Sequence, residues 1–308
     1  MKPITSVAIA SMFLVLTAGQ VCAGELWDPH LPGIDEGLSA GALPPPGIYG
    51  VLNSYSASFS QYDNSGHKTG VKVDAQVEVP VVLWQTGFKV LGADYAMALA
   101  KPLDYTNLKI RNDANLSDNG HWGTFNTVLV PGILSWSLPN DFHVKTALVV
   151  DVDDASSSPG HPPAGGGLGS GNGFWTVQPE LGVSWLHDGW NLSMDAFYSY
   201  NFKNTTTQYK SGQQLDVDYT VTKTIGKWTV GMGANQVTQT TSDSGAGAIA
   251  AGCPANGGCK AVNFGLGPLL GYQFVGIHVM AEFNRDVYTR NDVGGDRLNI
   301  RFSIPISL

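Results

Sequence analysis

The sequence alternates apolar and polar residues over about twelve segments, and this period of two restricts the fold more than any other feature. Successive side chains of a β-strand point to opposite faces, so each segment predicts a strand with one apolar and one polar face. A helix would scatter the same residues around its axis. In the clearest case the apolar face carries Val71, Val73, Ala75, Val77, Val79, Val81 and Leu83, and the polar face carries Lys72, Asp74, Gln76 and Glu78.

The other expected strands follow the same pattern. It is strong over 142–152, 190–202, 215–225 and 298–308, and weaker over 48–60, 88–100, 122–136, 174–186, 228–237, 261–273 and 275–287. Strands that cross a bilayer at a tilt need about 9–11 residues, whereas sandwich strands usually have about 5–6. The sequence therefore predicts an all-β, antiparallel transmembrane β-barrel of about 12 strands, with a secreted β-sandwich or solenoid as the alternative.

The connections between these strands alternate in length. Long polar loops are expected near 61–70, 101–121, 153–173, 203–213, 238–260 and 288–296, and tight turns at Gln85-Thr86-Gly87, Pro139-Asn140-Asp141, His187-Asp188-Gly189 and Gly226-Lys227. This alternation predicts long extracellular loops and short periplasmic turns. An aromatic girdle near the turns is expected from Trp84, Trp136, Trp185, Trp190 and Trp228. Trp84 has the parity of the polar face, which would require a bulge or an inward ring.

The polar faces of such a barrel are expected to line the lumen, and the apolar faces to meet lipid. Mixed charges in a closed barrel predict ion pairs across the lumen that narrow the bore. These charged residues could have a structural role, in which the lumen keeps their charges hydrated, or could contact a solute, and both roles remain open. The candidate channel-lining residues are Lys72, Asp74, Glu78, Lys145, Glu180, Asp195, Asp216, Asp218, Glu282, Arg297 and Arg301.

The first 46 residues have a different character. Residues 1–23 resemble an export signal, because Lys2 precedes the apolar run from Ile4 to Ala18 and small residues suit cleavage before Gly24. A buried or anchoring helix is the alternative, although the run is shorter than the roughly 20 residues that span a bilayer. Residues 24–46 are rich in Pro and Gly and precede the barrel at 47–308. Their apolar residues, Leu26, Trp27, Leu31, Ile34, Leu38 and Leu43, favour either a plug inside the barrel, by analogy with fatty-acid channels, or a tail packed under the periplasmic rim.

Cys253 and Cys259 flank a loop of Pro, Ala, Asn and Gly, which predicts a disulfide in an exported protein. A metal site would need further Cys or His nearby, and a redox pair normally has the Cys-x-x-Cys spacing. The disulfide is therefore favoured over both.

Composition and motifs argue against several other functions. A net charge of −8 gives no basic surface for nucleic acid. No Ser/His motif of an outer-membrane lipid hydrolase is recognisable, and Asp151-Val152-Asp153-Asp154 lacks the glycine turn and bidentate Glu of a calcium loop. The glycine-rich stretch 164–171 does not join a strand to a helix, so it is not a phosphate-binding loop. We expect no catalytic residues, metal or cofactor, and the oligomeric state is undetermined.

Several motifs together resemble the family named after the meta-pathway of phenol degradation, which includes sphingosine-induced outer-membrane channels. The motifs are the proline-rich start 41–49, Phe174-Trp175-Thr176-Val177-Gln178-Pro179-Glu180-Leu181, Tyr209-Lys210-Ser211-Gly212, Leu215-Asp216-Val217-Asp218-Tyr219, Leu266-Gly267-Pro268 and Gly295-Asp296-Arg297-Leu298. The resemblance implies an outer-membrane barrel of a Gram-negative bacterium that passes small, hydrophobic or aromatic molecules, with outer-membrane lipid and such solutes as its partners. A non-conducting structural or lipid-modifying barrel is the alternative function.

Overall fold

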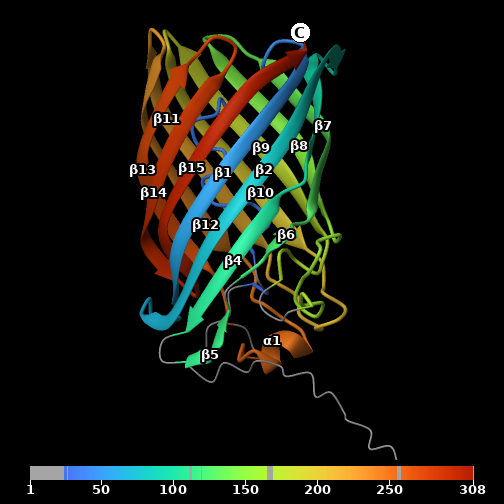
Figure 1. The fold of residues 1–308 in the computed structure, drawn as a ribbon. Coiled ribbons are helices and arrows are strands. Elements are labelled where there is room, and N and C mark those ends of the chain that lie inside the picture. Colours follow the sequence, from blue (N-terminus) through green and yellow to red (C-terminus); the bar gives the residue numbers. More distant parts are fainter. Residues whose placement is uncertain are drawn as a thin grey trace, which may run out of the picture.

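The computed structural model describes residues 24–25, 27–110, 113–118, 120–164, 169–254 and 258–307, and the expected signal, residues 1–23, lies outside them. The described residues form one antiparallel sheet that closes into a barrel (Figure 1). Closure occurs because β1 (Gly47–Tyr62) pairs with both β2 (Lys68–Val90) and β15 (Asp292–Ser307). A closed sheet leaves no unpaired edge, as a membrane-spanning sheet requires.

The remaining strands follow around the barrel and pair with their neighbours in the sheet. They are β3 (Ala93–Ala100), β4 (Leu103–Ile110), β5 (Asp113–Asp118), β6 (Trp122–Thr124), β7 (Thr127–Ser137), β8 (Phe142–Val152), β9 (Thr176–His187), β10 (Trp190–Asn201), β11 (Gln214–Ile225), β12 (Trp228–Gln239), β13 (Val262–Gln273) and β14 (His278–Arg290). The described residues also contain a short helix, α1 (Ala246–Ala250), and no helix that is long and apolar enough to cross a membrane.

Two of the barrel strands are interrupted. β3 and β4 both pair with β2, while β7 pairs with β3 and β6 with β4. Counting β3 with β4 and β6 with β7 as halves of one strand each, the described residues form a barrel of 12 strands, as the sequence predicts. At the two breaks the Phe125 N–H donates to the Pro102 carbonyl at 2.9 Å. The expected loop at 101–121 is therefore wrong in part, because it contains β4 and β5.

Short turns gather at the rim that holds the C-terminal end of β15, and the longer loops with α1 and β5 gather at the other (Figure 1). We call these the turn rim and the loop rim. Three expected turns are confirmed by positive φ angles at Asn140 and Asp141, at Asp188, and at Gly226. The turn expected at Gln85-Thr86-Gly87 is wrong, because β2 continues to Val90 and the chain turns at Leu91 and Gly92, both with positive φ.

Two expected long loops are short. The connection between β14 and β15 is Asn291 alone, instead of residues 288–296, and the connection between β1 and β2 is residues 63–67, instead of 61–70. The polar and glycine-rich composition of 292–296 resembles a loop, but these residues pair in register with β1, from Asp292 opposite Tyr62 onwards. Backbone pairing with a neighbouring strand overrides local composition here.

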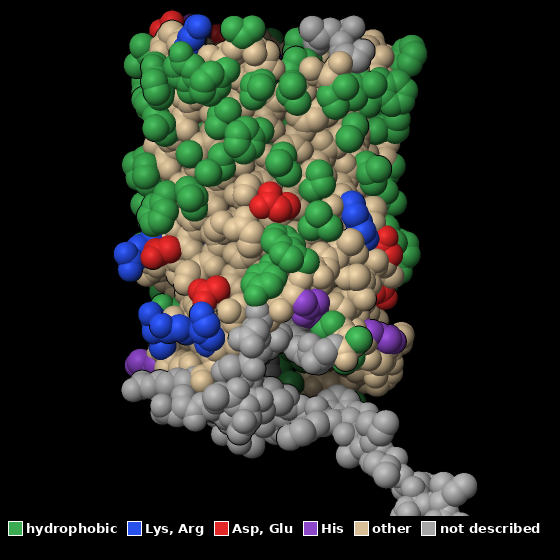
Figure 2. Space-filling view, in the orientation of Figure 1, with side chains coloured by type: hydrophobic (Ala, Val, Ile, Leu, Met, Phe, Trp, Pro, Cys, Tyr) green, Lys and Arg blue, Asp and Glu red, His purple; other side chains and the backbone are tan. Residues whose placement is uncertain are grey.

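The lipid-facing parity is as expected in four of the five clearest strands. Exposed apolar side chains include Leu148 on β8, Leu192 on β10, Val221 on β11 and Phe302 on β15. Figure 2 shows apolar side chains over the part of the outer surface nearer the turn rim and most of the charged side chains nearer the loop rim. The apolar part is the surface that meets lipid.

The parity expected for β2 is wrong. Val77 is 2% exposed and belongs to a buried cluster with Ala75 and Val79, against which Leu31 and Ile34 of the N-terminal segment pack. The polar residues of the same strand, including Lys72, Asp74 and Glu78, lie on the outer face. The valines turn inward because they have an apolar partner inside the barrel, which the alternation alone does not reveal.

The outward face of β2 changes character along its length. It is polar from Lys72 to Glu78 and continues with Val82 and Trp84 at the same parity, which are 49% and 44% exposed. Trp84 therefore faces outward in a regular stretch of strand, paired with Ile48. Trp84 has the parity of the polar face because that face of β2 points outward. The bulge or inward ring expected from the sequence is therefore not needed.

A charge on the outward apolar face of β2 should destabilise the barrel, whereas a change on its outward polar face should not. We expect Val82→Arg to lower the free energy of unfolding by about 2 kcal/mol, because lipid does not solvate a guanidinium. Lys72→Gln, at the same parity, should stay within about 0.5 kcal/mol of the wild type. Urea titration in lipid vesicles, followed by the gel mobility of unboiled protein, measures both. A neutral Val82→Arg would show that this parity does not face lipid.

Candidate functional site

The segment before β1 lies inside the barrel and runs from the loop rim to the turn rim, and Figure 1 draws it in dark blue. Near its start, the Trp27 N–H donates to Asn172 Oδ1 at 3.1 Å. Near its end, the Gly41 N–H donates to Ser184 Oγ at 2.7 Å, and Ser135 Oγ donates to the Gly41 carbonyl at 2.8 Å. We call residues 27–46 the inner segment; Leu26 lies outside the described residues.

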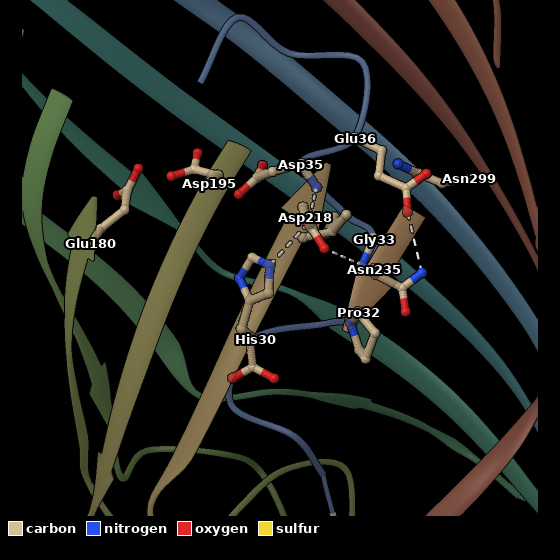
Figure 3. A network of polar contacts seen from close by, with 12 residues as sticks. His30, Pro32, Gly33, Asp35, Glu36, Glu180, Asp195, Asp218, Asn235 and Asn299 are labelled. Atoms are coloured by element: carbon tan, nitrogen blue, oxygen red, sulfur yellow. Dashed lines mark hydrogen bonds and ion pairs between the residues drawn. The ribbon is translucent and has the colours of Figure 1, made fainter. Parts of the chain in front are cut away.

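Asp218 on β11 holds the middle of the inner segment (Figure 3). Its carboxylate accepts the Gly33 N–H at 2.9 Å and the Asp35 N–H at 3.0 Å, and it lies 3.2 Å from His30 Nε2. The His30 ring and the Asp218 carboxylate thus form a buried polar contact between the segment and the barrel wall.

Arg301 on β15 also holds the inner segment, from the same polar half of the barrel wall. Its guanidinium donates to the Glu36 carbonyl at 2.9 Å and to the Ile34 carbonyl. It also pairs with Glu282 at 2.9 Å and donates to Asn53 Oδ1 at 2.9 Å. Backbone carbonyls at the centre of a barrel have no strand partner, so the arginine supplies the donors that they need.

The Glu36 side chain contacts two asparagine amides and occupies the space that a glycine of the wall leaves free. Asn284 Nδ2 lies 2.6 Å from each of its carboxylate oxygens, and Asn235 Nδ2 lies 3.2 Å from Oε1. A Cβ added at Gly233 would lie 1.8 Å from Oε2, so only glycine leaves room for Glu36. The Gly182 position is similar, because its Cβ would lie 2.2 Å from the Ala40 carbonyl oxygen.

Most of the expected lumen charges lie inside the barrel, but they pair along the wall. Lys145 on β8 contacts Glu180 on β9 and Asp195 on β10, the latter at 3.1 Å. Pairs across the lumen were expected; here the inner segment occupies the space between opposite walls. Of the predicted lining residues, those that lie inside are Lys145, Glu180, Asp195, Asp216, Asp218, Glu282, Arg297 and Arg301.

The other three predicted lining residues, Lys72, Asp74 and Glu78, lie on the outer face of β2. Asp74 pairs with Lys109 of β4 at 3.0 Å and accepts from Ser58 Oγ at 2.8 Å, and Glu78 accepts from Ser54 Oγ at 2.9 Å. These three predictions are wrong for the reason given above: the valines of β2 face inward.

Sequence reasoning missed the polar residues of the inner segment, namely His30, Asp35 and Glu36. Only their position next to Pro and Gly in an otherwise apolar segment could have indicated them. The ligand atoms of His30, Asp35 and Asp218 lie within 4.8 Å of one another, a spacing that could hold a cation. However, Asp218 is already engaged by three donors of the inner segment, so these groups serve as a contact between segment and wall.

A cavity of about 320 Å³ lies between the inner segment and one half of the barrel wall. The inner segment contributes Trp27, Leu31, Ile34 and Leu38, and the wall is mainly apolar on this side. The apolar wall residues are Val51, Val77, Val79, Val81, Leu83, Ala98, Leu99, Ala100, Val128, Val130, Ile133 and Val149. The opposite half of the lumen, from β9 to β15, is polar.

The disulfide expected between Cys253 and Cys259 is present, with the two Cα atoms 5.7 Å apart. Both cysteines pack with Tyr209 and Ala248 in a small buried cluster in the loops. The disulfide therefore stabilises the loop rim and lies outside the barrel lumen.

Comparisons with known proteins agree with this architecture. The sequence profile of the family described as "Putative MetA-pathway of phenol degradation" matches residues 58–302. No protein of curated function matches. The fold is similar to that of the COG4313 outer membrane channel from Pseudomonas putida F1, with a TM-score of 0.68 and 14% identity over 86% of this chain and 97% of the other. The translocator domain of the autotransporter NalP from Neisseria meningitidis is less similar, with a TM-score of 0.47 and 9% identity over 85% of this chain and 90% of that domain.

The family match covers most of the chain, and the structural similarity concerns the same closed barrel. The chain belongs to the family described as the putative MetA-pathway of phenol degradation, and it has the fold of an outer-membrane β-barrel channel.

Proposed function

We propose that the protein passes small hydrophobic or aromatic molecules across the outer membrane, and that the cavity beside the inner segment is the site where they bind on the way. The observation that carries this proposal is the division of the lumen. One half is mainly apolar and supplies most of the cavity wall, and the other half is polar and holds the inner segment through Asp218 and Arg301. A pore for ions or sugars would instead have polar groups along the open path.

The size of the cavity supports a small solute. About 320 Å³ is enough for an aromatic molecule of one or two rings, and ligand pockets in proteins start at about 300 Å³. The polar groups at its border include His30, Asn53 and Gln178, which could orient a hydroxyl group. The charged side chains of Asp35, Lys145, Asp151, Glu180 and Arg301 also reach its border. The name of the Pseudomonas putida structure, an outer membrane channel, supports passive passage as the general mode.

We propose further that the inner segment is a plug that limits passage of polar solutes. It extends through the lumen and contacts walls on opposite sides, through Asp218 of β11, Arg301 of β15 and Ser184 of β9. A barrel of twelve strands without it would hold a wider, water-filled bore, because bore width grows with strand number. The plug leaves the apolar cavity as the selective path.

Displacing the inner segment without altering the barrel tests the plug. Gly182→Ala should do so, because the added Cβ would overlap the Ala40 carbonyl oxygen at 2.2 Å. Overpacking of this kind costs about 1–3 kcal/mol. Here the clash destabilises the contact between the inner segment and the barrel wall. We expect higher single-channel conductance in planar bilayers and faster nitrocefin hydrolysis by intact cells.

Gly132→Ala is the matched control, because its Cβ would meet only Tyr95 at 3.7 Å. It should behave as the wild type in both assays. Unchanged conductance in Gly182→Ala, with the segment shown by protease protection to have moved, would contradict the plug. No conductance in any variant would favour the non-conducting barrel.

Filling the cavity tests the solute class. Ala100→Phe places a ring in the cavity, whereas Ala196→Phe adds the same ring on the outward face of β10. The added ring should weaken binding of a ligand in the cavity by about 1–3 kcal/mol. Uptake of the apolar probe N-phenyl-1-naphthylamine by intact cells should therefore fall about tenfold or more in Ala100→Phe. Ala196→Phe should leave it unchanged. Equal uptake in both variants would show that apolar solutes do not use the cavity.

A further inference from the structure

The start of the described chain is held by the loop rim. The Gly24 nitrogen lies 3.2 Å from Asp243 Oδ2, and the Gly24 carbonyl oxygen lies 3.3 Å from the Tyr209 hydroxyl oxygen. The Glu25 N–H donates to Ser211 Oγ at 3.0 Å. All three partners belong to the loops that follow β10 and β12, so the chain begins at the loop rim before it enters the barrel.

Asp243 is built into this rim. It is 4% exposed, and its carboxylate accepts the Gly212 N–H at 2.7 Å, Gln239 Nε2 at 2.6 Å and the Tyr209 hydroxyl. Tyr209 in turn packs on the cluster that contains the disulfide. The carboxylate is thus fixed in position, with Oδ2 directed at the Gly24 nitrogen.

No lysine, arginine or histidine within the described part of the chain forms an ion pair with Asp243 or with Glu25. The lysines of the same loops are directed elsewhere: Lys203 Nζ donates to Gln208, Lys210 Nζ lies over the Tyr200 ring, and Lys260 Nζ donates to the Thr240 carbonyl at 2.8 Å. Two acidic groups are therefore enclosed without a cation.

The enclosure changes the pKa of both acidic groups. Burial raises the pKa of Glu25 to about 7 and raises the pKa of Asp243 above its usual range. Among charged groups, Asp153 also faces Glu25 and adds to the effect. A buried carboxylate without a cation is unfavourable, because burial removes the water that would stabilise its charge. A positive charge on the Gly24 nitrogen, 3.2 Å from Asp243 Oδ2, would offset this cost.

We propose that Asp243 is the binding site for the α-ammonium group of Gly24, which is created when residues 1–23 are removed. Hydrolysis of the Ala23–Gly24 bond by a leader peptidase adds one water, leaves a carboxylate on Ala23 and leaves an amine on Gly24, which takes up a proton. The amide nitrogen of the uncleaved chain carries one hydrogen and no charge, whereas the ammonium carries three hydrogens and one positive charge. Cleavage therefore adds a positive charge to the contact that the Gly24 nitrogen makes with Asp243, and strengthens the hold of the loops on the start of the inner segment.

The mature protein in detergent allows a direct test. Mass spectrometry of the N-terminal peptide establishes that Gly24 is the first residue, and acylation of its amine by an N-hydroxysuccinimide ester is followed against pH. We expect the apparent pKa of the amine to lie at least about one unit above the usual 7.7–8.0, because the ammonium is paired. Asp243→Asn should return the pKa to that range and speed acylation at pH 7 about tenfold.

Two further variants separate the charge from the structure. One extra alanine between Ala23 and Gly24 moves the amine by one residue and leaves Asp243 in place, and it should give the same fast acylation. Asp63→Asn removes another loop carboxylate, whose bonds to Ser65 and His67 are local, and should react like the wild type.

The proposal is overturned if the first residue is not Gly24, or if the wild-type amine titrates like that of Asp243→Asn while both barrels are folded by gel mobility. It is also overturned if the alanine insertion leaves acylation as slow as in the wild type. These readouts do not depend on solute passage, so they test the site independently of the channel.

Discussion

Closure of the sheet is the constraint on which the rest of the structure depends. In a bilayer each backbone N–H and C=O must be bonded within the protein, and the pairing of β1 with β2 and β15 satisfies this for the edges. Closure encloses a lumen, and the lumen must be filled with water, with side chains or with another part of the chain. In this protein the inner segment fills much of it, and its own backbone groups then need partners on the wall.

Those partners explain why the lumen has two different halves. Asp218 and Arg301 supply an acceptor and donors for the backbone of residues 33–36, and Asn235 and Asn284 bind the Glu36 side chain. The other side of the segment carries leucine and isoleucine side chains and lies opposite the valines of β2. The polar half thus holds the segment, and the apolar half supplies most of the wall of the cavity of about 320 Å³. The division of the lumen into a polar and an apolar half therefore accounts both for the position of the inner segment and for the apolar character of most of the cavity wall.

Much of the fold could be predicted from sequence because its signals are local. Alternation located each of the twelve strands, and Asn140, Asp188 and Gly226 marked turns because these residues tolerate positive φ. Errors occurred where pairing overrides composition, as in Asp292 to Asp296, which look like a loop and pair with β1. β4 was missed for the same reason. Eight of the eleven predicted lining residues lie inside because β8 to β15 follow the usual rule of a polar interior.

The sequence by itself determined that β2 has an apolar and a polar face, and that the chain carries an apolar segment before the barrel and a disulfide near its end. Only the tertiary structure decided which face of β2 points inward. Alternation separates two faces but does not say what each meets, and Val77 is buried because Leu31 and Ile34 lie inside the barrel. The contacts of His30 with Asp218 and of Gly24 with Asp243 join residues about two hundred positions apart. No local pattern encodes such pairs, because they arise from threading one end of the chain through a closed sheet.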